Sequence, residues 1–235
     1  MQALVLFDFD GTLADTAFDL AAAANQQRNY RGLPPLPYDT LRPHASHGAR
    51  GLLKAALNLD AESEAYEAVR QQFLHDYAQI MNEHTRLFPG IRDLLSRLQT
   101  QGFTWGIVTN KTEVLTWPMV RYLGLQTHCR VVVCGDTTPH IKPHPAPLLH
   151  AASQAGLPPG HSLYIGDDLR DIQAGKAAGM ATVAAGYGYC SMDDPANWGA
   201  NAVAHTPDEL WPLIRHWSET IQDRSGQPSG GTPET

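Results

Sequence analysis

The sequence predicts an α/β fold: a Rossmann-like, doubly wound parallel sheet with a helical cap domain inserted after the first strand. Three observations lead to this fold class. Short apolar segments alternate with helical patterns along most of the chain, which is typical of a parallel sheet covered by helices on both faces. Residues 16–84 break that alternation, because they show helical patterns and no convincing strand. The chain has 235 residues, 43 % of them hydrophobic, which is enough to bury one core with an insertion.

The expected strands are short apolar runs that end in polar residues or glycine. They are Ala3–Phe7, Thr104–Val108, Arg130–Cys134, Ser162–Ile165 and, with a weaker pattern, Ala181–Ala185. Helical patterns lie between them at Ile91–Gln101, Glu113–Leu123, Ala146–Ala155 and Arg170–Ala178. Each pattern is followed by a glycine, as expected just past the end of a helix, and these glycines are Gly102, Gly124, Gly156 and Gly179.

The inserted region carries three helical patterns, at Phe18–Asn29, Ala49–Leu57 and Ser63–Glu83. A proline-rich stretch interrupts the patterns, and Phe88-Pro89-Gly90 returns the chain to the sheet. We therefore expect a core domain made of residues 1–15 and 85–222, with residues 16–84 as the helical cap. The polar segment 223–235 is expected to be a disordered tail, because few of its residues are apolar.

Composition limits the partners. The formal net charge is −7 and no run of Lys or Arg stands out, so the sequence argues against nucleic acid and against a membrane surface. No stretch approaches the roughly 20 apolar residues that span a bilayer, and the start of the chain lacks the pattern of a secretory leader. The three cysteines form no C-x-x-C pair, which favours free thiols in a reducing compartment. We expect a cytoplasmic protein that acts on a small molecule.

Polar and charged residues follow every strong strand. They are Asp8-Phe9-Asp10-Gly11-Thr12, Thr109-Asn110-Lys111, Lys142-Pro143 in the loop after the third strand, and Gly166-Asp167-Asp168-Leu169-Arg170-Asp171. Because ligands bind at the carboxyl ends of the strands in an open parallel sheet, these segments are expected to meet in one site.

The first of these segments either forms a turn or helix cap or supplies two carboxylates for phosphoryl transfer, the chemistry that the resemblance of all four segments to a phosphatase family implies. A carboxylate at Asp8 can attack phosphorus and divide one difficult step into two. Asp10 stands two residues further along an extended segment, so its side chain projects on the same side as that of Asp8. There it can protonate the leaving oxygen and later deprotonate the attacking water.

A phosphate dianion repels a carboxylate nucleophile, so the site also needs positive charge. Mg²⁺ prefers oxygen ligands and usually takes one or two carboxylates, for which Asp8 and Asp167 are the candidates. Lys142 can supply a fixed positive charge to the phosphate and to Asp8. Thr109 offers a hydroxyl for a phosphoryl oxygen, and its neighbour Asn110 is a candidate substrate contact.

The sequence does not decide whether three further residues have a functional or a structural role. Asp168 and Asp171 can orient metal-bound waters, or Asp168 can simply cap the helix that follows it. Lys111 is either a substrate contact or a surface charge.

In this order and strand context, the four segments resemble the haloacid dehalogenase (HAD) superfamily of phosphatases and phosphomutases. The resemblance covers nearly the whole chain except its C-terminal tail. It implies a nucleophile at Asp8, a general acid and base at Asp10, and the backbone carbonyl of Asp10 as a further Mg²⁺ ligand. The helical insertion is similar to the cap that follows the first strand in one type of this superfamily.

The cap is expected to select the substrate. Its segment His44–Arg50 offers Ser46, His47 and Arg50 as donors to a carboxylate or to sugar hydroxyls, and Arg50 could bind a carboxylate with two hydrogen bonds. The alternative is a glycine-containing turn at the start of a helix.

Within the superfamily the chain resembles the phosphoglycolate phosphatase group, and most of all the N-acetylmuramic acid 6-phosphate phosphatases of bacterial peptidoglycan recycling. The matching segments are Arg31-Gly32-Leu33-Pro34, Gly48-Ala49-Arg50, Trp105-Gly106-Ile107-Val108-Thr109-Asn110-Lys111, Gly166-Asp167-Asp168-Leu169-Arg170-Asp171-Ile172, Gly186-Tyr187-Gly188-Tyr189 and Asn197-Trp198-Gly199-Ala200. His47 departs from the small residue expected there. Both substrates carry a phosphate and a carboxylate, so the sequence leaves the choice open.

Two other functions fit the same fold. A phosphomutase would keep Asp8 and Asp10 but return the phosphoryl group to a sugar. A non-catalytic phosphate-binding module would retain the fold alone, and the complete set of Asp8, Asp10, Thr109, Lys142 and Asp167 argues against it.

Overall fold

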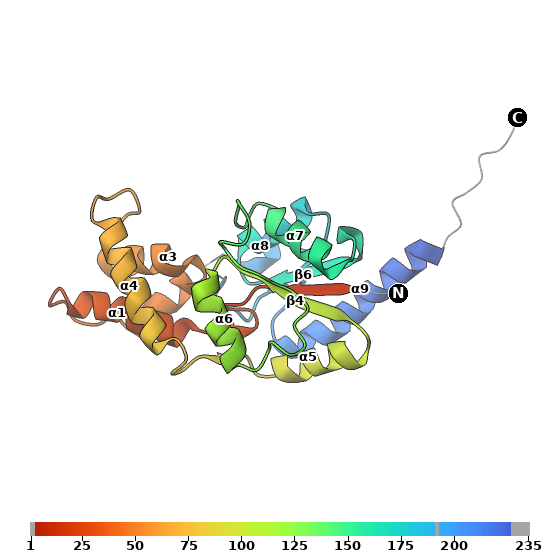
Figure 1. Cartoon of the computed structure of the whole chain (residues 1–235), viewed down its shortest axis with the longest axis horizontal. Coiled ribbons are helices and arrows are strands. Elements are labelled where there is room, and N and C mark those ends of the chain that lie inside the picture. Colours follow the sequence, from red (N-terminus) through yellow and green to blue (C-terminus); the bar gives the residue numbers. More distant parts are fainter. Residues whose placement is uncertain (1–2, 191–192, 227–235) are drawn as a thin grey trace, which may run out of the picture.

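The protein is described by a computed structural model of residues 3–190 and 193–226. A six-stranded parallel sheet lies at the centre of its larger part (Figure 1). In spatial order its strands are β5 (Val132–Val133), β4 (Thr104–Val108), β1 (Leu4–Phe7), β6 (Ser162–Gly166), β7 (Ala181–Ala185) and β8 (Ala202–Ala204). The chain leaves β1 toward β4 on one side and later crosses to β6 on the other. The predicted fold class is confirmed.

Alternate residues of the central strand β1 face two different helix layers, as the pleat of a strand requires. The helices are α5 (Ile91–Thr100), α6 (Glu113–Tyr122), α7 (Ala146–Ala155), α8 (Leu169–Ala177) and α9 (Leu210–Gly226). Val5 and Phe7 share a buried cluster with residues of α5, α6 and α9. Leu4 and Leu6 share another with residues of α7 and α8. In Figure 1, α7 and α8 lie above the sheet and α5 and α9 below it.

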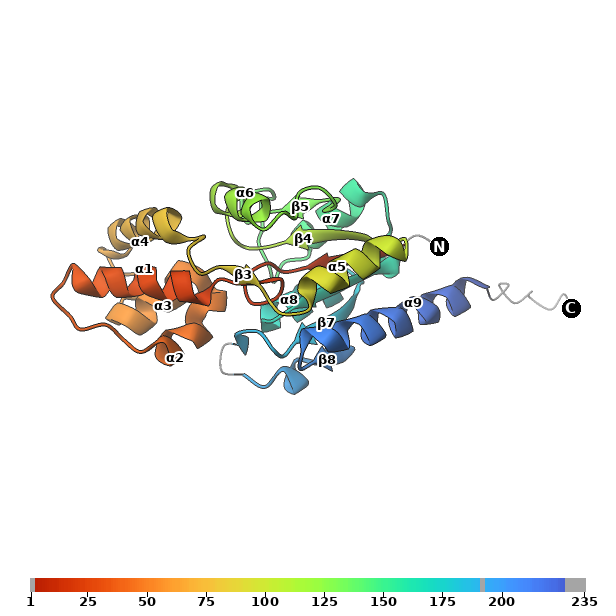
Figure 2. The ribbon, with the colours of Figure 1, turned by 90° about the horizontal axis from the view of Figure 1, so that it is seen from below.

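The segment 16–84 forms a separate group of helices at one end of the molecule (Figure 2). Its elements are α1 (Ala17–Asn29), α2 (Tyr38–Leu41), the 3-10 helix η1 (Arg42–His47), α3 (Gly48–Leu57) and α4 (Tyr66–Ile80). Helix α1 packs against both α3 and α4. We refer to residues 16–84 as the cap, and its exact boundaries stay a prediction.

Two short connections join the cap to the sheet, and they pair with each other. The strands β2 (Ala14–Asp15) and β3 (Arg86–Leu87) form an antiparallel ladder. Buried Asp19 on α1 accepts the backbone N–H groups of His84 at 3.0 Å and Thr85 at 3.0 Å, and the Thr85 hydroxyl at 2.9 Å. The entry and exit of the cap are thereby held side by side.

Several elements differ from the sequence prediction. Strand β5 has two residues instead of five, because it pairs on one side only and Cys134 already bonds the Thr137 hydroxyl of the next turn. Strands β2, β3 and β8 were not predicted, since two or three residues carry no alternating pattern. Helix α9 was also missed. It continues through residues 223–226, which the sequence analysis assigned to the disordered tail, and residues 227–235 lie outside the described part.

The four glycines predicted at helix ends all have left-handed backbone conformations. The φ angles are +77° at Gly102, +71° at Gly124, +73° at Gly156 and +73° at Gly179. Among the described residues, no helix is both long and apolar enough to cross a membrane.

We expect Gly156→Ala to lower the free energy of unfolding by about 1–2 kcal/mol, because a Cβ atom disfavours the left-handed conformation. A Cβ at Gly156 meets no atom within 4 Å, so the cost is purely one of backbone conformation. Gly160→Ala is the matched control, since that site is equally open and its φ angle lies outside the left-handed region. Urea denaturation measures both, and equal stabilities would contradict the assignment.

Candidate active site

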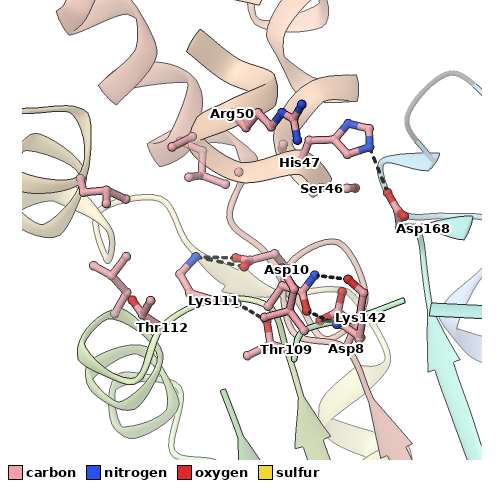
Figure 3. Close-up of a pocket in the computed structure, with 18 of the residues that line it drawn as sticks. Asp8, Asp10, Ser46, His47, Arg50, Thr109, Lys111, Thr112, Lys142 and Asp168 are labelled. Carbon is pink, nitrogen blue, oxygen red and sulfur yellow. Dashed lines mark hydrogen bonds and ion pairs between the residues drawn. The ribbon is translucent and has the colours of Figure 1, made fainter. Parts of the chain in front are cut away.

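The segments that follow β1, β4 and β6 share one edge of the sheet, because β1 lies between the other two strands. Asp8 follows β1, Thr109 follows β4 and Asp167 follows β6. The loop after β5 brings Lys142 to the same place, as Figure 3 shows for Asp8, Thr109 and Lys142. The structure therefore brings together the core residues that the sequence singled out.

Lys142 lies at the bottom of the site and is only 3 % exposed. Its ammonium group is 2.8 Å from Oδ1 of Asp8 and 2.7 Å from Oδ1 of Asp171. It also donates to the Tyr164 hydroxyl at 2.8 Å and to the Val108 carbonyl at 3.2 Å. Although burial lowers it, the carboxylates of Asp171 and Asp8 hold the pKa of Lys142 above its ordinary value. Lys142 is therefore a fixed cation.

Asn110 fixes the loop that carries this lysine. Its side-chain amide donates to the Lys142 carbonyl at 3.0 Å, and its Oδ1 accepts the Lys142 N–H at 2.9 Å. Both ends of the amide are thus bonded to backbone. The predicted role of Asn110 as a substrate contact stays untested, while its positioning of Lys142 is direct.

Three carboxylates converge beside Lys142. Asp8, Asp167 and Asp171 each place a carboxylate oxygen within 4.8 Å of the others. Burial raises the pKa of Asp8 to about 7, opposed by Lys142 and reinforced by Asp171. Burial, together with the carboxylates of Asp8 and Asp171, raises the pKa of Asp167 to about 8. Ionising all three carboxyl groups costs free energy unless a further cation binds beside them.

The chemistry of this cluster fits a divalent cation. Carboxylate oxygens are the ligands that Mg²⁺ prefers. Asp167 is held firmly, because it accepts the Thr12 hydroxyl at 3.1 Å, the Ser46 hydroxyl at 2.9 Å and the Tyr189 N–H at 2.9 Å. The backbone also packs closely around it, since a Cβ at Gly11 would lie 2.2 Å from an Asp167 oxygen.

The Asp10 side chain lies outside the three-carboxylate cluster and pairs with a different lysine. Nζ of Lys111 lies 2.9 and 3.0 Å from the two Asp10 oxygens (Figure 3). The Thr16 hydroxyl donates to the same carboxylate at 2.6 Å. Thr109, 3 % exposed, accepts the Lys111 N–H at 3.2 Å. Lys111 is therefore part of the site and not a surface charge.

Asp168 caps helix α8. Its Oδ1 accepts the Arg170 N–H at 2.9 Å, and its carboxylate also bonds the Arg170 guanidinium at 2.7 Å. Asp171 completes a capping box by accepting the Asp168 N–H at 3.1 Å. Of the open alternatives, the structure thus shows the capping role for Asp168 and places Asp171 in the carboxylate cluster.

The cap contributes the roof of the site through η1 and the start of α3. Besides Ser46, His47 reaches the core, with Nε2 3.5 Å from Asp168 and a side chain 42 % exposed. Burial and the nearby Arg170 cation lower the pKa of His47. Arg50 is 72 % exposed and lies 3.5 Å from Glu62. In Figure 3 Arg50 lies at the end of the pocket away from Asp8.

A pocket of about 340 Å³ separates floor from roof. Apolar side chains form much of its wall, among them Phe73, Leu74, Leu115 and Ile141. Asp8, Lys111 and Lys142 line the floor, and Arg50, Tyr66 and Arg70 line the cap side. A volume near 300 Å³ is at the lower limit for pockets that hold organic ligands.

Sequence reasoning missed several polar side chains of the site. Tyr164 bonds Lys142 from within β6, and Tyr77 bonds Lys111 from the cap helix α4 at 3.1 Å. Both are large residues inside apolar patterns, where a tyrosine is ordinarily part of the core. Arg70 resembles any charged residue on the outside of a helix.

Comparisons with known proteins agree with the geometry. The profile of the haloacid dehalogenase-like hydrolase family matches residues 5–185. An N-acetylmuramic acid 6-phosphate phosphatase of Pseudomonas aeruginosa is 44 % identical over 211 residues, 89 % of this chain and 93 % of that protein. A phosphoglycolate phosphatase of Xanthomonas campestris pv. campestris is 44 % identical over 209 residues, 88 % of this chain and 94 % of the other.

A solved structure shows the same architecture. The crystal structure of a predicted phosphoglycolate phosphatase from Haemophilus somnus superposes with a TM-score of 0.81 at 27 % identity, covering 90 % of this chain and 97 % of that one. The four strand-end motifs, the parallel sheet and the family profile lead to the same conclusion: this chain belongs to the haloacid dehalogenase-like hydrolase family.

Proposed function

We propose that this chain is a Mg²⁺-dependent phosphatase that hydrolyses a small, carboxylate-bearing phosphate monoester through an aspartyl-phosphate on Asp8. The observation that carries the proposal is the grouping of Asp8 with Lys142 and with two further carboxylates. Asp8, Lys142 and Asp171 line the floor of the pocket that the cap covers, and the third carboxylate, Asp167, is fully buried. Relatives 44 % identical to the chain are named phosphatases, which supports it.

In the first step Asp8 attacks phosphorus, the bond from phosphorus to the leaving oxygen breaks, and Asp10 gives that oxygen a proton. Lys142 stabilises negative charge on the phosphoryl oxygens, and the Thr109 hydroxyl binds one of them. In the second step a water attacks phosphorus and Asp10 takes its proton. The bond between Asp8 and phosphorus then breaks and inorganic phosphate leaves.

A metal ion would be held by Asp8, Asp167 and the backbone carbonyl of Asp10, next to Asp171. Bound there, Mg²⁺ would supply positive charge opposite the phosphoryl oxygens. The chain's own contribution is to keep the three carboxylates close together and to limit access of bulk water with the cap, apart from the water that attacks in the second step.

We expect Asp8→Asn to abolish phosphate release and leave the fold intact, because the amide keeps the shape of the carboxylate but is no nucleophile. Assays measure inorganic phosphate from phosphoglycolate and N-acetylmuramate 6-phosphate without a bisphosphate activator, which also separates a hydrolase from a phosphomutase. Asp39→Asn, at an exposed cap position, is the control. Wild-type rates in Asp8→Asn would reject the nucleophile.

Removal of divalent ions with EDTA is expected to stop turnover, and Mg²⁺ is expected to restore it. Mg²⁺ should also raise the melting temperature, since a ligand at 100 times its Kd stabilises the folded state by about 2.7 kcal/mol. Asp167→Asn removes one ligand and should abolish most of that rise. An equal rise in both proteins would place the ion elsewhere.

The substrate's carboxylate is assigned to Arg50, which lines the pocket from the cap. We expect Arg50→Ala to lower kcat/KM about tenfold on phosphoglycolate or N-acetylmuramate 6-phosphate, corresponding to ~1.4 kcal/mol of transition-state binding. The loss on p-nitrophenyl phosphate, which has no carboxylate, should be smaller.

Lys54→Ala is the matched control for Arg50→Ala. Lys54 lies one turn later on α3 and pairs with Asp60 at 2.8 Å, as Arg50 pairs with Glu62. It is not among the residues that line the pocket. Equal losses on carboxylated and uncarboxylated substrates in Arg50→Ala would reject the carboxylate contact.

A further inference from the structure

Tyr77 connects the cap to the floor of the active site. It belongs to helix α4, yet its hydroxyl oxygen lies 3.1 Å from Nζ of Lys111, which follows β4 of the core. The contact is closed to solvent, with Tyr77 1 % exposed and the Lys111 side chain 7 % exposed. The Tyr77 hydroxyl also lies 3.7 Å from the Met119 sulfur, its acceptor.

The Lys111 ammonium has three N–H groups, and three oxygens surround it. Two belong to Asp10, at 2.9 and 3.0 Å, and the third is the Tyr77 hydroxyl. A buried ammonium is held in one orientation when all its donors are bonded, and a lost acceptor leaves a donor unsatisfied. Tyr77 therefore helps to fix where Lys111 sits, and Lys111 fixes the Asp10 carboxylate.

Packing alone does not account for the Tyr77 hydroxyl. Phe73, one turn earlier on α4, is as deeply buried and lines the same pocket without a polar group. The Tyr77 ring also lies near Lys111, with Nζ 4.8 Å from its centroid, and a phenylalanine would keep this contact. The hydroxyl adds two interactions: it donates to the Met119 sulfur and accepts from Lys111, the lysine that pairs with Asp10.

We propose that Tyr77 is a positioning residue that acts through Lys111 on Asp10, so that the cap helix α4 supports proton transfer in the core. The inference rests on the proposed phosphatase function. Asp10 gives a proton to the leaving oxygen as the phosphorus–oxygen bond breaks, and takes one from water in the second step. A general acid works only within hydrogen-bond reach of its partner, so a looser Asp10 slows both transfers.

Substrates with different leaving groups distinguish a role of Tyr77 in proton transfer from a general loss of order in the site. Sugar and alkyl phosphates need a proton on the leaving oxygen, whereas p-nitrophenolate leaves without one. In Tyr77→Phe we expect kcat/KM to fall about tenfold on whichever of phosphoglycolate and N-acetylmuramate 6-phosphate the wild type hydrolyses. That loss is part of the roughly 10²–10⁴-fold contribution of general acid–base catalysis. On p-nitrophenyl phosphate kcat/KM should stay within about twofold of the wild type.

A double-mutant cycle tests whether Tyr77 acts through Lys111. Lys111→Met should show the same substrate dependence with a larger loss, and adding Tyr77→Phe to it should change kcat/KM no further. Tyr30→Phe, which removes an exposed cap hydroxyl, is the control and should match the wild type. Additive losses in the double variant would overturn the inference.

Three other results would also overturn it: equal losses on both classes of substrate, no loss in Tyr77→Phe, or a marked fall in melting temperature that assigns the hydroxyl to stability. If Tyr77→Phe left the Asp8-dependent release of phosphate unchanged, this inference would be rejected and the proposed function would stand. Absence of phosphate release from the wild type would overturn both.

Discussion

Four carboxylates and two lysine ammonium groups meet at the carboxyl end of the sheet, and the rest of the site depends on how they pair. Lys142 bonds Asp8 and Asp171, while Lys111 bonds Asp10. Asp167 has hydroxyl and N–H donors but no ammonium partner among the residues that the structure describes, and burial raises its pKa to about 8. Buried carboxylates in this number favour binding of a cation, and a phosphate dianion can approach only once such charge is present.

The order of the strands makes this crowding possible. β1 stands between β4 and β6, so the loop after β1 bonds the loop after β4 through Asp10 and Lys111. It also bonds the loop after β6 through Thr12 and Asp167. The same topology places the crevice where the chain switches from one side of the sheet to the other, which is where α/β proteins bind ligands. The cap then covers the crevice: Ser46 bonds Asp167, and the Arg170 guanidinium donates to the Ser46 carbonyl at 2.8 Å.

The sequence was sufficient for the sheet and for the floor of the site, because both follow from strong local patterns. Apolar runs that precede Asp8, Thr109 and Asp167 predict three strands and the edge of the sheet at which these residues meet. The short elements could not be predicted, since β8 has three residues and owes its position to pairing with β7. The predicted start of the tail, at residue 223, differs from the structure because α9 continues to Gly226, beyond its last apolar residues.

Roles that depend on tertiary contacts were also beyond the sequence. Nothing in the helical pattern around Tyr77 distinguishes it from a core residue, and only the fold brings it to Lys111. The sequence alone does not distinguish a site role for Lys111 from a surface charge, and its contact with Asp10 places it in the site. The amide of Asn110 is bonded at both ends to the loop of Lys142, a contact that its place in the sequence does not reveal, and its contact with substrate stays a prediction.

The proposed mechanism transfers a phosphoryl group to Asp8. Rapid acid quenching during turnover, followed by digestion and mass spectrometry, locates that group directly. We expect the added mass of one phosphoryl group on the peptide that contains Asp8, sensitive to hydroxylamine as an acyl phosphate is, and no such product with Asp8→Asn. A phosphorylated residue other than Asp8 formed at the rate of turnover would contradict it.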